Sequence, residues 1–473
     1  MTDGNQLIEK LLSHAKAHLE LSDYDLPCKR SLLRYILRVE DNTPAPVDQI
    51  MDGQSLKKEL ISYALEKGLT YGDSTSGFAS FVMSLLSPLP SAVNKKFRTM
   101  REQLGAASAC EYLYSLSVGD WGIDGLSLDK KTRLYSQDGP VEILVANTLS
   151  TEDGCTVEPR IEHCDCNDVV RSVSISLDGE ECLLQYVSSL SRDEECFIYS
   201  KNNAFLPPFD TKINAMLDFI EYIPDYSITA TNNPLFIAKN QPAFVAGRFT
   251  PTAFTVKPDF SLESKAYPDV EISLFHQINS GVRLQSFNRN TLERLSTEIL
   301  TAWHNYQDQN IGLTGVQGDG AGQNFASVCV RYTKDGRYCV DIALTCKKSV
   351  PDGFGKAFSN FAGDLGPEAL FGMVILTEKF NDVLKMISAV LTKKIPLDNS
   401  LFTERAPLYG FEEFLNGIIA DLGYFKDEQK AQNQLKTAMT AAIKRAIKDK
   451  SPFSFDDDGT RSFKIFLSTV DVK

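Results

Sequence analysis

The spacing of apolar residues changes near residue 118, and this change limits the folds open to the 473-residue chain. Before it, apolar residues recur at intervals of three and four, as in Leu7, Leu11 and Leu12, which predicts amphipathic helices. We expect these helices at 6–21, 28–39, 55–67 and 77–87. After it, short apolar runs alternate with turns rich in Asp, Gly and Ser, which is typical of strands. The sequence therefore predicts an α+β fold in which a helical N-terminal region, 1–118, precedes a body that contains the sheet.

The body divides into two unequal α+β halves, 119–260 and 261–397. In the first half we expect a helix at 211–223 with Asp210 as its N-cap, and strands at 141–146, 172–177, 183–187 and 196–199. In the second half we expect a strand at 270–275, helices at 290–306 and 377–391, and a hairpin of 327–333 and 338–345 that turns over 334–336. Helices at 410–422 and 427–448 fill a C-terminal segment, 398–448. The last residues, 449–473, form a tail in which 462–468 alternate as in an edge strand, after an exposed turn at 456–458.

The composition is that of a soluble globular protein and argues against several other classes of protein. Hydrophobic residues make up 43% of the chain and charged residues 23%, as in a soluble globular protein, and no apolar run approaches the length of a membrane span. The N-terminus does not have the pattern of a signal peptide, and ten scattered cysteines suggest reduced thiols in a cytoplasmic protein. A net charge of −13 argues against a nucleic acid or an anionic membrane as the partner, but is compatible with a phosphorylated small molecule.

The order of several local phrases resembles that of bacterial class II galactose-1-phosphate uridylyltransferases over roughly residues 20–445. These phrases are LSPLPSAVNKKF at 86–97, CEYLYSLS at 110–117, MLDFIEYIPDY at 216–226 and TNNP at 231–234. The resemblance implies a histidine-triad-like fold, in which two half-barrel units share one core. By analogy with the family, it also implies a homodimer.

The family's chemistry depends on a histidine that this chain lacks. In the family, a histidine of a His-x-His motif takes the uridylyl group from UDP-glucose and passes it to a hexose 1-phosphate, because neutral imidazole is both a nucleophile and a good leaving group. The matching stretch here reads QPAFVAG at 241–247, so Ala243 stands at the position of the nucleophile and Gln241 at that of its supporting histidine. The chain has five histidines, none of them between His163 and His276. We therefore predict no catalytic residue of the family type.

The resemblance implies that other parts of the family's site are retained. Asn324 ends a glycine-rich run that lacks both a Walker Lys-Ser/Thr pair and the dinucleotide-binding spacing, so a flexible hairpin connection is the alternative interpretation of this run. The predicted ligand-binding residues are Asn232, Asn233, Asn324, Asp352, Gly353 and Lys356.

A metal site is a weaker hypothesis. His163, Cys164 and Cys166 offer imidazole and thiolate ligands that suit zinc. However, Cys-x-Cys is not the usual zinc knuckle, and no second pair of ligands stands elsewhere in the chain. We therefore expect reduced thiols, no metal and no cofactor.

Three functions remain open. The first is a divergent uridylyltransferase-like protein that binds a nucleotide sugar or sugar phosphate without the covalent step, either as a sensor or as the partner of an active paralogue. The second is an enzyme with altered transfer chemistry, in which Lys356, Arg248 or Asp352 stabilises charge. This alternative includes residual UDP-glucose–hexose-1-phosphate uridylyltransferase activity in galactose metabolism. The third is a non-catalytic interaction module whose cleft is filled by Phe244, Phe249, Phe354 and Phe358. The sequence does not decide whether the protein is an enzyme.

Overall fold

A computed structural model describes most of the chain as two compact units. Unit 1 comprises Met1–Ser127, Pro159–Ser189 and Glu194–Asn202, and unit 2 comprises Leu128–Glu158, Leu190–Asp193 and Asn203–Lys473. The described residues are 3–40, 43–47, 49–71, 75–117, 131–135, 142–146, 172–186, 193–200, 212–231, 243–248, 251–254, 257–276, 279–311, 313, 324–346, 370–376, 378–403, 406, 408–449 and 451–472.

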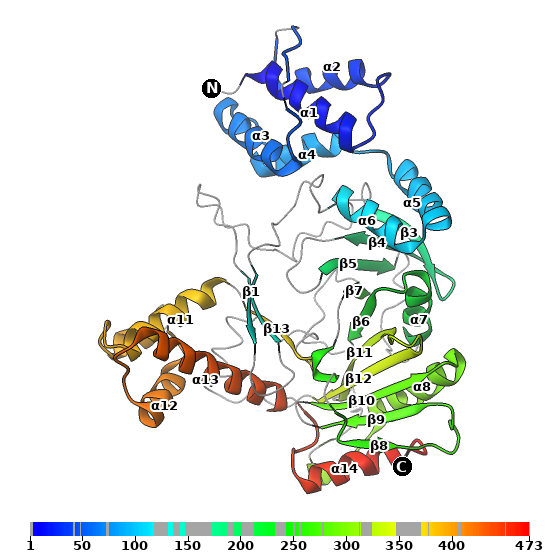
Figure 1. The fold of residues 1–473 in the computed structure, drawn as a ribbon, viewed down its shortest axis with the longest axis vertical. Helices are drawn as coiled ribbons and strands as arrows, with labels where there is room; N and C mark the ends of the chain where they lie inside the picture. The colour runs from blue at the N-terminus through cyan, green and yellow to red at the C-terminus, as the bar shows by residue number, and fades with distance from the viewer. Residues whose placement is uncertain are drawn as a thin grey trace. The chain divides into compact units, whose positions relative to one another are not determined.

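Unit 1 begins with helices, as the apolar spacing predicted (Figure 1). They are α1 (Gly4–His18), α2 (Leu26–Leu37), α3 (Gly53–Lys67), α4 (Thr75–Leu86), α5 (Pro90–Leu104) and α6 (Ala106–Ser117). Helix α1 packs on α2 and α3 through its buried Leu7, Leu11 and Leu12. Asp3 and Asp52 cap the N-termini of α1 and α3, where each side chain accepts a hydrogen bond from a first-turn amide. In this region the apolar spacing and the N-capping residues thus both indicate helices.

Three antiparallel strands complete unit 1, namely β3 (Ser172–Leu177), β4 (Glu180–Tyr186) and β5 (Asp193–Ser200), in the order β3-β4-β5. Helix α5 packs on β3 and α6 on β4. The two-residue turn between β3 and β4 has Asp178 and Gly179 in left-handed conformations, as a tight hairpin requires. These strands confirm the β-type runs expected here.

Unit 2 contains seven antiparallel strands in the order β7-β6-β11-β12-β10-β9-β8. The strands are β6 (Ser227–Thr231), β7 (Phe244–Arg248), β8 (Phe260–Leu262), β9 (Glu271–Phe275), β10 (Ser280–Ser286), β11 (Asn324–Tyr332) and β12 (Tyr338–Cys346). Helices α7 (Ile213–Tyr222) and α8 (Arg289–Asn305) cover one face of this sheet. The β11–β12 hairpin confirms the predicted turn, in which Gly336 has a positive φ of 83°. The helix expected at 211–223 begins two residues later than predicted. Its N-cap is Lys212, so the prediction of Asp210 as the N-cap was wrong.

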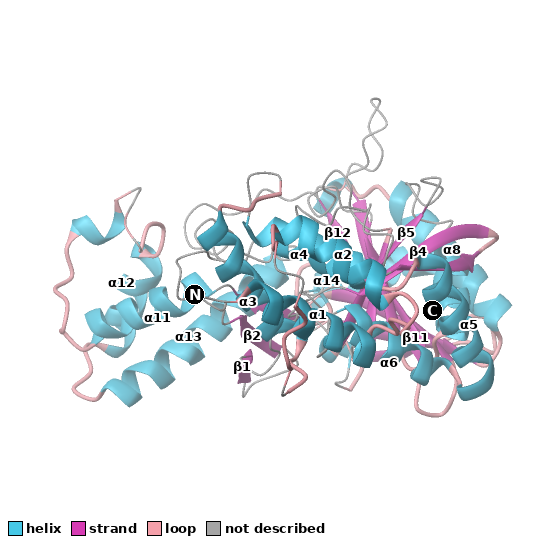
Figure 2. Ribbon diagram, turned by 90° about the horizontal axis from the view of Figure 1, so that it is seen from above, coloured by secondary structure: helices cyan, strands magenta, loops and turns pink. Residues whose placement is uncertain are grey.

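A second sheet and a helical cluster occupy another part of unit 2. The sheet has the order β1-β2-β13, with β1 (Lys131–Tyr135), β2 (Glu142–Ala146) and β13 (Met373–Leu376). Helices α11 (Glu378–Leu391), α12 (Glu412–Leu422) and α13 (Glu428–Asp449) lie together, as both ribbon views show (Figure 2). Their apolar residues form one buried cluster that includes Cys329 and Ala343 of the large sheet. The C-terminal helices therefore cover part of the sheet face that α7 and α8 leave free.

The tail is a helix, so the prediction of an edge strand at 462–468 was wrong. Helix α14 runs from Asp457 to Ser468, and Asp456 caps it by accepting a hydrogen bond from the amide of Gly459 at 2.7 Å. Phe463, Phe466 and Leu467 are buried, at the spacing of one helix face. The Asp456–Asp458 run is thus the start of a helix, where acidic residues are favourable, and not a simple turn.

The tail is anchored to the large sheet through His276, which directly follows β9. The imidazole Nε2 is 2.6 Å from the carbonyl oxygen of Ser454, and Phe455 stacks on the ring at 4.5 Å between centroids. Ser280 Oγ is 3.3 Å from Nδ1. Burial lowers the pKa of His276, although the hydrogen bond to the carbonyl oxygen of Ser454 and the charge of Asp259 oppose this effect. The neutral imidazole is therefore part of the tail's attachment.

The architecture agrees with the expected α+β class, with helical N- and C-terminal regions around a large antiparallel sheet. No helix in the described part of the chain combines the length and apolar character needed to cross a membrane. The histidine-triad-like fold and the five domain boundaries stay predictions.

Candidate functional site

Four strand ends meet at one end of the large sheet in unit 2. Strand β6 ends at Thr231, β7 begins at Phe244, β11 begins at Asn324 and β12 ends at Cys346. The register pairs Asn324 with Cys346 and Ser327 with Thr231, and it pairs Thr229 with Val245. Because neighbouring strands are antiparallel, these ends lie at the same edge, which we call the site end.

The segments that carry the predicted ligand contacts are all attached to the site end. Asn232 and Asn233 directly follow Thr231, Ala243 directly precedes β7, and Asn324 opens β11. Ala243 and Asn324 are described. The other predicted residues, Gln241, Asn232, Asn233, Asp352, Gly353 and Lys356, lie outside the described residues. The topology therefore places Ala243 and Asn324 at one edge of one sheet, and Asn232 and Asn233 directly follow the strand that ends there.

The face of the sheet opposite α7 and α8 carries polar side chains near the site end. Residues paired across antiparallel strands share a face, which places Thr229, Thr231 and Ser327 together. The hydroxyl of Ser327 donates to Thr231 Oγ1 at 2.9 Å. We call this the polar face. Val245 is on the same face as its partner Thr229, and the two-residue period places Ala243 there as well. Ala243 is half-buried, and its match to the position of the family's nucleophile stays a prediction.

Asn324 faces the other side of the sheet. Its Nδ2 donates to the carbonyl oxygens of Trp303 at 2.9 Å and Tyr306 at 2.8 Å, at the end of α8. Both amide hydrogens are thus used to hold the helix, and Oδ1 has no hydrogen-bond partner among the described residues. In this conformation the side chain has no N–H for a phosphate, and the predicted ligand contact stays a prediction.

A lysine that sequence reasoning missed lies beside the site end. Lys212 is the N-cap of α7, which runs antiparallel to β6, so this helix begins near the end of that strand. The side chain is buried, with 6% of the residue exposed, and its Nζ is 5.8 Å from the centroid of the Phe244 ring. Burial lowers the pKa of Lys212 to about 8. No signal in the sequence pointed to Lys212, because its burial depends on the packing of α7 against the sheet, and lysine is almost never fully buried unless it is paired.

Farther from the site end, the polar face contains buried charges. Asp341 on β12 is 0% exposed and accepts from Arg283 Nε at 2.6 Å and Nη2 at 2.9 Å. Arg331 Nη2 lies 3.6 Å from the same carboxylate. Asp341 raises the pKa of both guanidiniums, against the opposing effect of burial. Phe254 and Phe275 flank Arg283, and the side chains of Arg283 and Arg331 keep only 13% and 17% of their surface exposed, so this cluster is a largely internal structural element.

Four of the five histidines are described, and none of them stands on the strands of the site end. His14 and His18 lie on α1 in unit 1, His276 anchors the tail, and His304 lies on α8. His163 is outside the described residues. Among the described residues, the structure therefore offers no imidazole to replace the one missing at Ala243.

The metal hypothesis has no support within the described residues. His163, Cys164 and Cys166 lie outside them, and no group of three potential ligands occurs in the part of the chain that is described. The described cysteines are free thiols, and all except Cys28 are buried. Burial raises the pKa of Cys182 to about 12, which makes this thiol inert.

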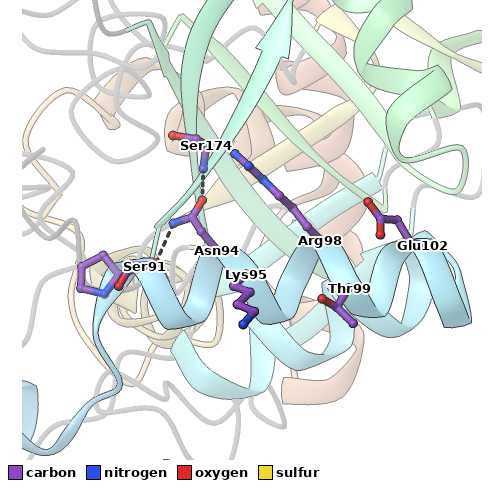
Figure 3. Close-up of a pocket in the computed structure, with 8 residues that line it drawn as sticks. Ser91, Asn94, Lys95, Arg98, Thr99, Glu102 and Ser174 are labelled. Carbon is purple, nitrogen blue, oxygen red and sulfur yellow. Dashed lines mark hydrogen bonds between the residues drawn. The ribbon is translucent and has the colours of Figure 1, made fainter.

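Unit 1 has an open groove of about 470 Å³ between α5 and β3 (Figure 3). The side chain of Asn94 joins the two elements, because it accepts from the amide of Ser174 at 2.7 Å and donates to the carbonyl of Ser172 at 3.2 Å. Arg98 extends toward β3, whereas Lys95 points away from it. The groove holds no buried nucleophile or base, so its evident role is the attachment of the helix to the strand.

Comparison with known proteins gives a single family name. Three curated bacterial proteins named galactose-1-phosphate uridylyltransferase match nearly the whole chain. The one from Caldanaerobacter subterraneus subsp. tengcongensis is 22% identical, with 98% of both chains covered. The one from Clostridium perfringens strain SM101 is 22% identical, with 99% of this chain and 100% of the relative covered. The one from Streptococcus mutans is 20% identical, with 96% of this chain and 98% of the relative covered. No protein-family model and no solved structure matches. The resemblance expected from the local phrases is confirmed.

Proposed function

We propose that this chain, a homologue of curated bacterial galactose-1-phosphate uridylyltransferases, binds a nucleotide sugar or sugar phosphate at the site end without forming a covalent uridylyl-histidine. One observation carries the proposal. Asn324 begins a strand at the site end and Asn232 and Asn233 directly follow another strand that ends there, as would be expected if the family's binding site were kept. The ligand class is taken from the relatives' names.

The absence of the covalent step follows from the chemistry of Ala243. A methyl group cannot attack phosphorus, and the described histidines belong to α1, α8 and the tail attachment. Without the covalent step, the chain could still bind a ligand and orient it. The backbone at the strand ends would orient a bound phosphate or sugar, because the hydroxyl groups of Thr229, Thr231 and Ser327 already donate to other protein groups.

The interaction-module alternative required aromatic rings to fill the cleft. Phe244 is described, and its ring is buried beneath Lys212 on the side of the sheet that α7 and α8 cover. This ring therefore does not fill a cleft on the polar face. Phe249, Phe354 and Phe358 lie outside the described residues.

Two measurements on the full chain test the proposal. Binding of UDP-glucose, UDP-galactose and galactose 1-phosphate is measured by calorimetry and thermal shift, since a ligand at a hundredfold excess over its dissociation constant stabilises the native state by about 2.7 kcal/mol. Intact mass spectrometry after incubation with UDP-glucose then detects any uridylyl adduct, with the Caldanaerobacter relative as the reference protein. We expect binding without an adduct. An adduct would refute the non-covalent reading, and turnover without an adduct would favour direct transfer between two bound substrates.

A steric variant locates the site. Ala243→Trp places an indole on the polar face at the site end, and we expect it to weaken UDP-glucose binding at least tenfold. Lys334→Trp adds the same ring in the exposed turn at the opposite end of the β11–β12 hairpin and serves as the control. Equal affinity in both variants would show that the ligand binds elsewhere.

A further inference from the structure

The start of helix α7 concentrates positive charge that no described residue neutralises. Ten residues long, the helix has no acidic residue in its first turn and no side-chain cap. The aligned peptide dipoles place about half a positive charge at such an N-terminus. The N-cap position, where Asp, Asn, Ser or Thr usually accepts from first-turn amides, is occupied by a cation, Lys212.

The ammonium of Lys212 adds a full charge at the same place. The residue is 94% buried, since 6% is exposed, and no carboxylate pairs with it among the described residues. Its one described partner is the ring of Phe244, at 5.8 Å, near the outer limit of a cation–π contact. The pKa of Lys212 is lowered by burial alone, with no charged neighbour to offset that effect. A buried cation with no counter-ion in the described part of a chain of net charge −13 indicates a position kept for an anion from outside the protein.

The ammonium of Lys212 lies at the same edge of the large sheet as the site end. The side chain of Lys212 reaches the first residue of β7, and Ala243 is the residue directly before that strand. Helix α7 packs on β6 and β11, which contribute Thr231 and Ser327 to the site end. Lys212 therefore lies at the same edge of the sheet as the site end, on the side that α7 covers, and a ligand bound at this edge would have to reach that side to contact it.

We propose that Lys212 and the N-terminus of helix α7 form an anion site that binds a phosphate group of the ligand. Helix N-termini bind phosphate because their first amides point toward the anion and the dipole favours negative charge. The ammonium adds a charge-assisted hydrogen bond. The identity of the ligand rests on the proposed function, whereas the anion site itself does not.

The test compares the wild type with Lys212→Met and Lys212→Arg, using UDP-glucose and inorganic pyrophosphate as separate probes. Methionine is close to lysine in volume but has no charge, and arginine keeps the charge. Lys385→Met removes an exposed lysine of α11 and is the matched control. We expect Lys212→Met to weaken both probes at least tenfold, Lys212→Arg to weaken them less, and Lys385→Met to leave them unchanged.

The pH profile separates a binding role from a structural one. Since Lys212 must be protonated to bind an anion, the wild-type affinity should fall as the pH rises through 8 to 9.5. Lys212→Arg stays charged over this range and reports any titration of the probe itself. A parallel profile in the wild type and Lys212→Arg would overturn the proposal.

The probes distinguish the two proposals. If UDP-glucose binds the wild type and Lys212→Met equally, the anion site is wrong and the proposed function stands. If pyrophosphate binds in a Lys212-dependent way but UDP-glucose does not bind, the anion site stands and the proposed function is wrong. If neither probe binds the wild type, both are wrong.

Discussion

Asp341 holds two buried guanidiniums, and its removal should be costly. The carboxylate is fully buried and makes two short hydrogen bonds to Arg283, with Arg331 at 3.6 Å. Asp341→Asn keeps the shape of the side chain but leaves two positive charges in the interior with no counter-charge among the described residues. Breaking a buried pair in this way costs about 3–5 kcal/mol. This is a large part of the 5–15 kcal/mol typical of a folded domain.

Urea unfolding followed by the fluorescence of Trp303, which is buried in unit 2, measures the loss. We expect a lower midpoint with an unchanged slope, because the same surface is exposed on unfolding. The loss should persist in 0.5 M salt, since buried pairs are screened far less than exposed ones. Asp335→Asn is the control, because this carboxylate forms an exposed pair with Arg337.

Replacement of the two arginines should affect the stability of unit 2 differently. Arg283→Met leaves Asp341 with only the distant Arg331 and should destabilise unit 2. Arg331→Met removes the surplus charge and should be neutral or stabilising. If Asp341→Asn behaves like Asp335→Asn, or if both arginine variants lose equal stability, the reasoning from uncompensated buried charge is refuted.

Three further outcomes follow from the structure. The folded-state pKa of Lys212 is about 8 against an ordinary value of 10.5, so the free wild type should gain stability as the pH rises from 8 to 10.5, whereas Lys212→Met should show no such gain in thermal melts. Burial lowers the pKa of His276, so the neutral form stabilises the tail above pH 6.5, and this contribution should be lost as the pH falls below that value. His276→Gln should flatten this acid dependence, with the fluorescence of Trp303, which contacts the tail, as the readout. Gly459→Ala should destabilise the tail in urea titrations, because a Cβ would lie 1.9 Å from the carbonyl oxygen of Ser454, and a wild-type midpoint would contradict the packing described here.

The sequence predicted those helices and turns that are specified by residues close together in the chain. The apolar spacing of α1 and the turn at Gly336 in the β11–β12 hairpin are examples. The tail was mistaken for a strand because Phe463, Ile465 and Leu467 alternate. The structure instead buries Phe463, Phe466 and Leu467 and leaves Ile465 54% exposed. The sequence signal that could have decided between helix and strand was Asp456, which caps the helix by accepting a hydrogen bond from the amide of Gly459.

Only some residues of the candidate site could likewise be identified from the sequence. Ala243 could be singled out from the sequence because the family motif defines its position. The charges of Lys212, Arg283 and Asp341 could not, since burial and ion pairing depend on which strands are neighbours. Arg283 and Asp341 are 58 residues apart in the chain and meet only through the β10–β12 register. No local periodicity contains that information.

The tail also shields the large sheet from other chains. Strand β8 is the last in the unit 2 order and is only three residues long. Val472 pairs with Ser264 just beyond it, and Lys464 lies over the ring of Phe260 at 3.4 Å. An uncovered strand edge is a template for pairing with a second molecule. Because the C-terminal residues cover this edge, loss of the tail's attachment would expose it to pairing with a second molecule.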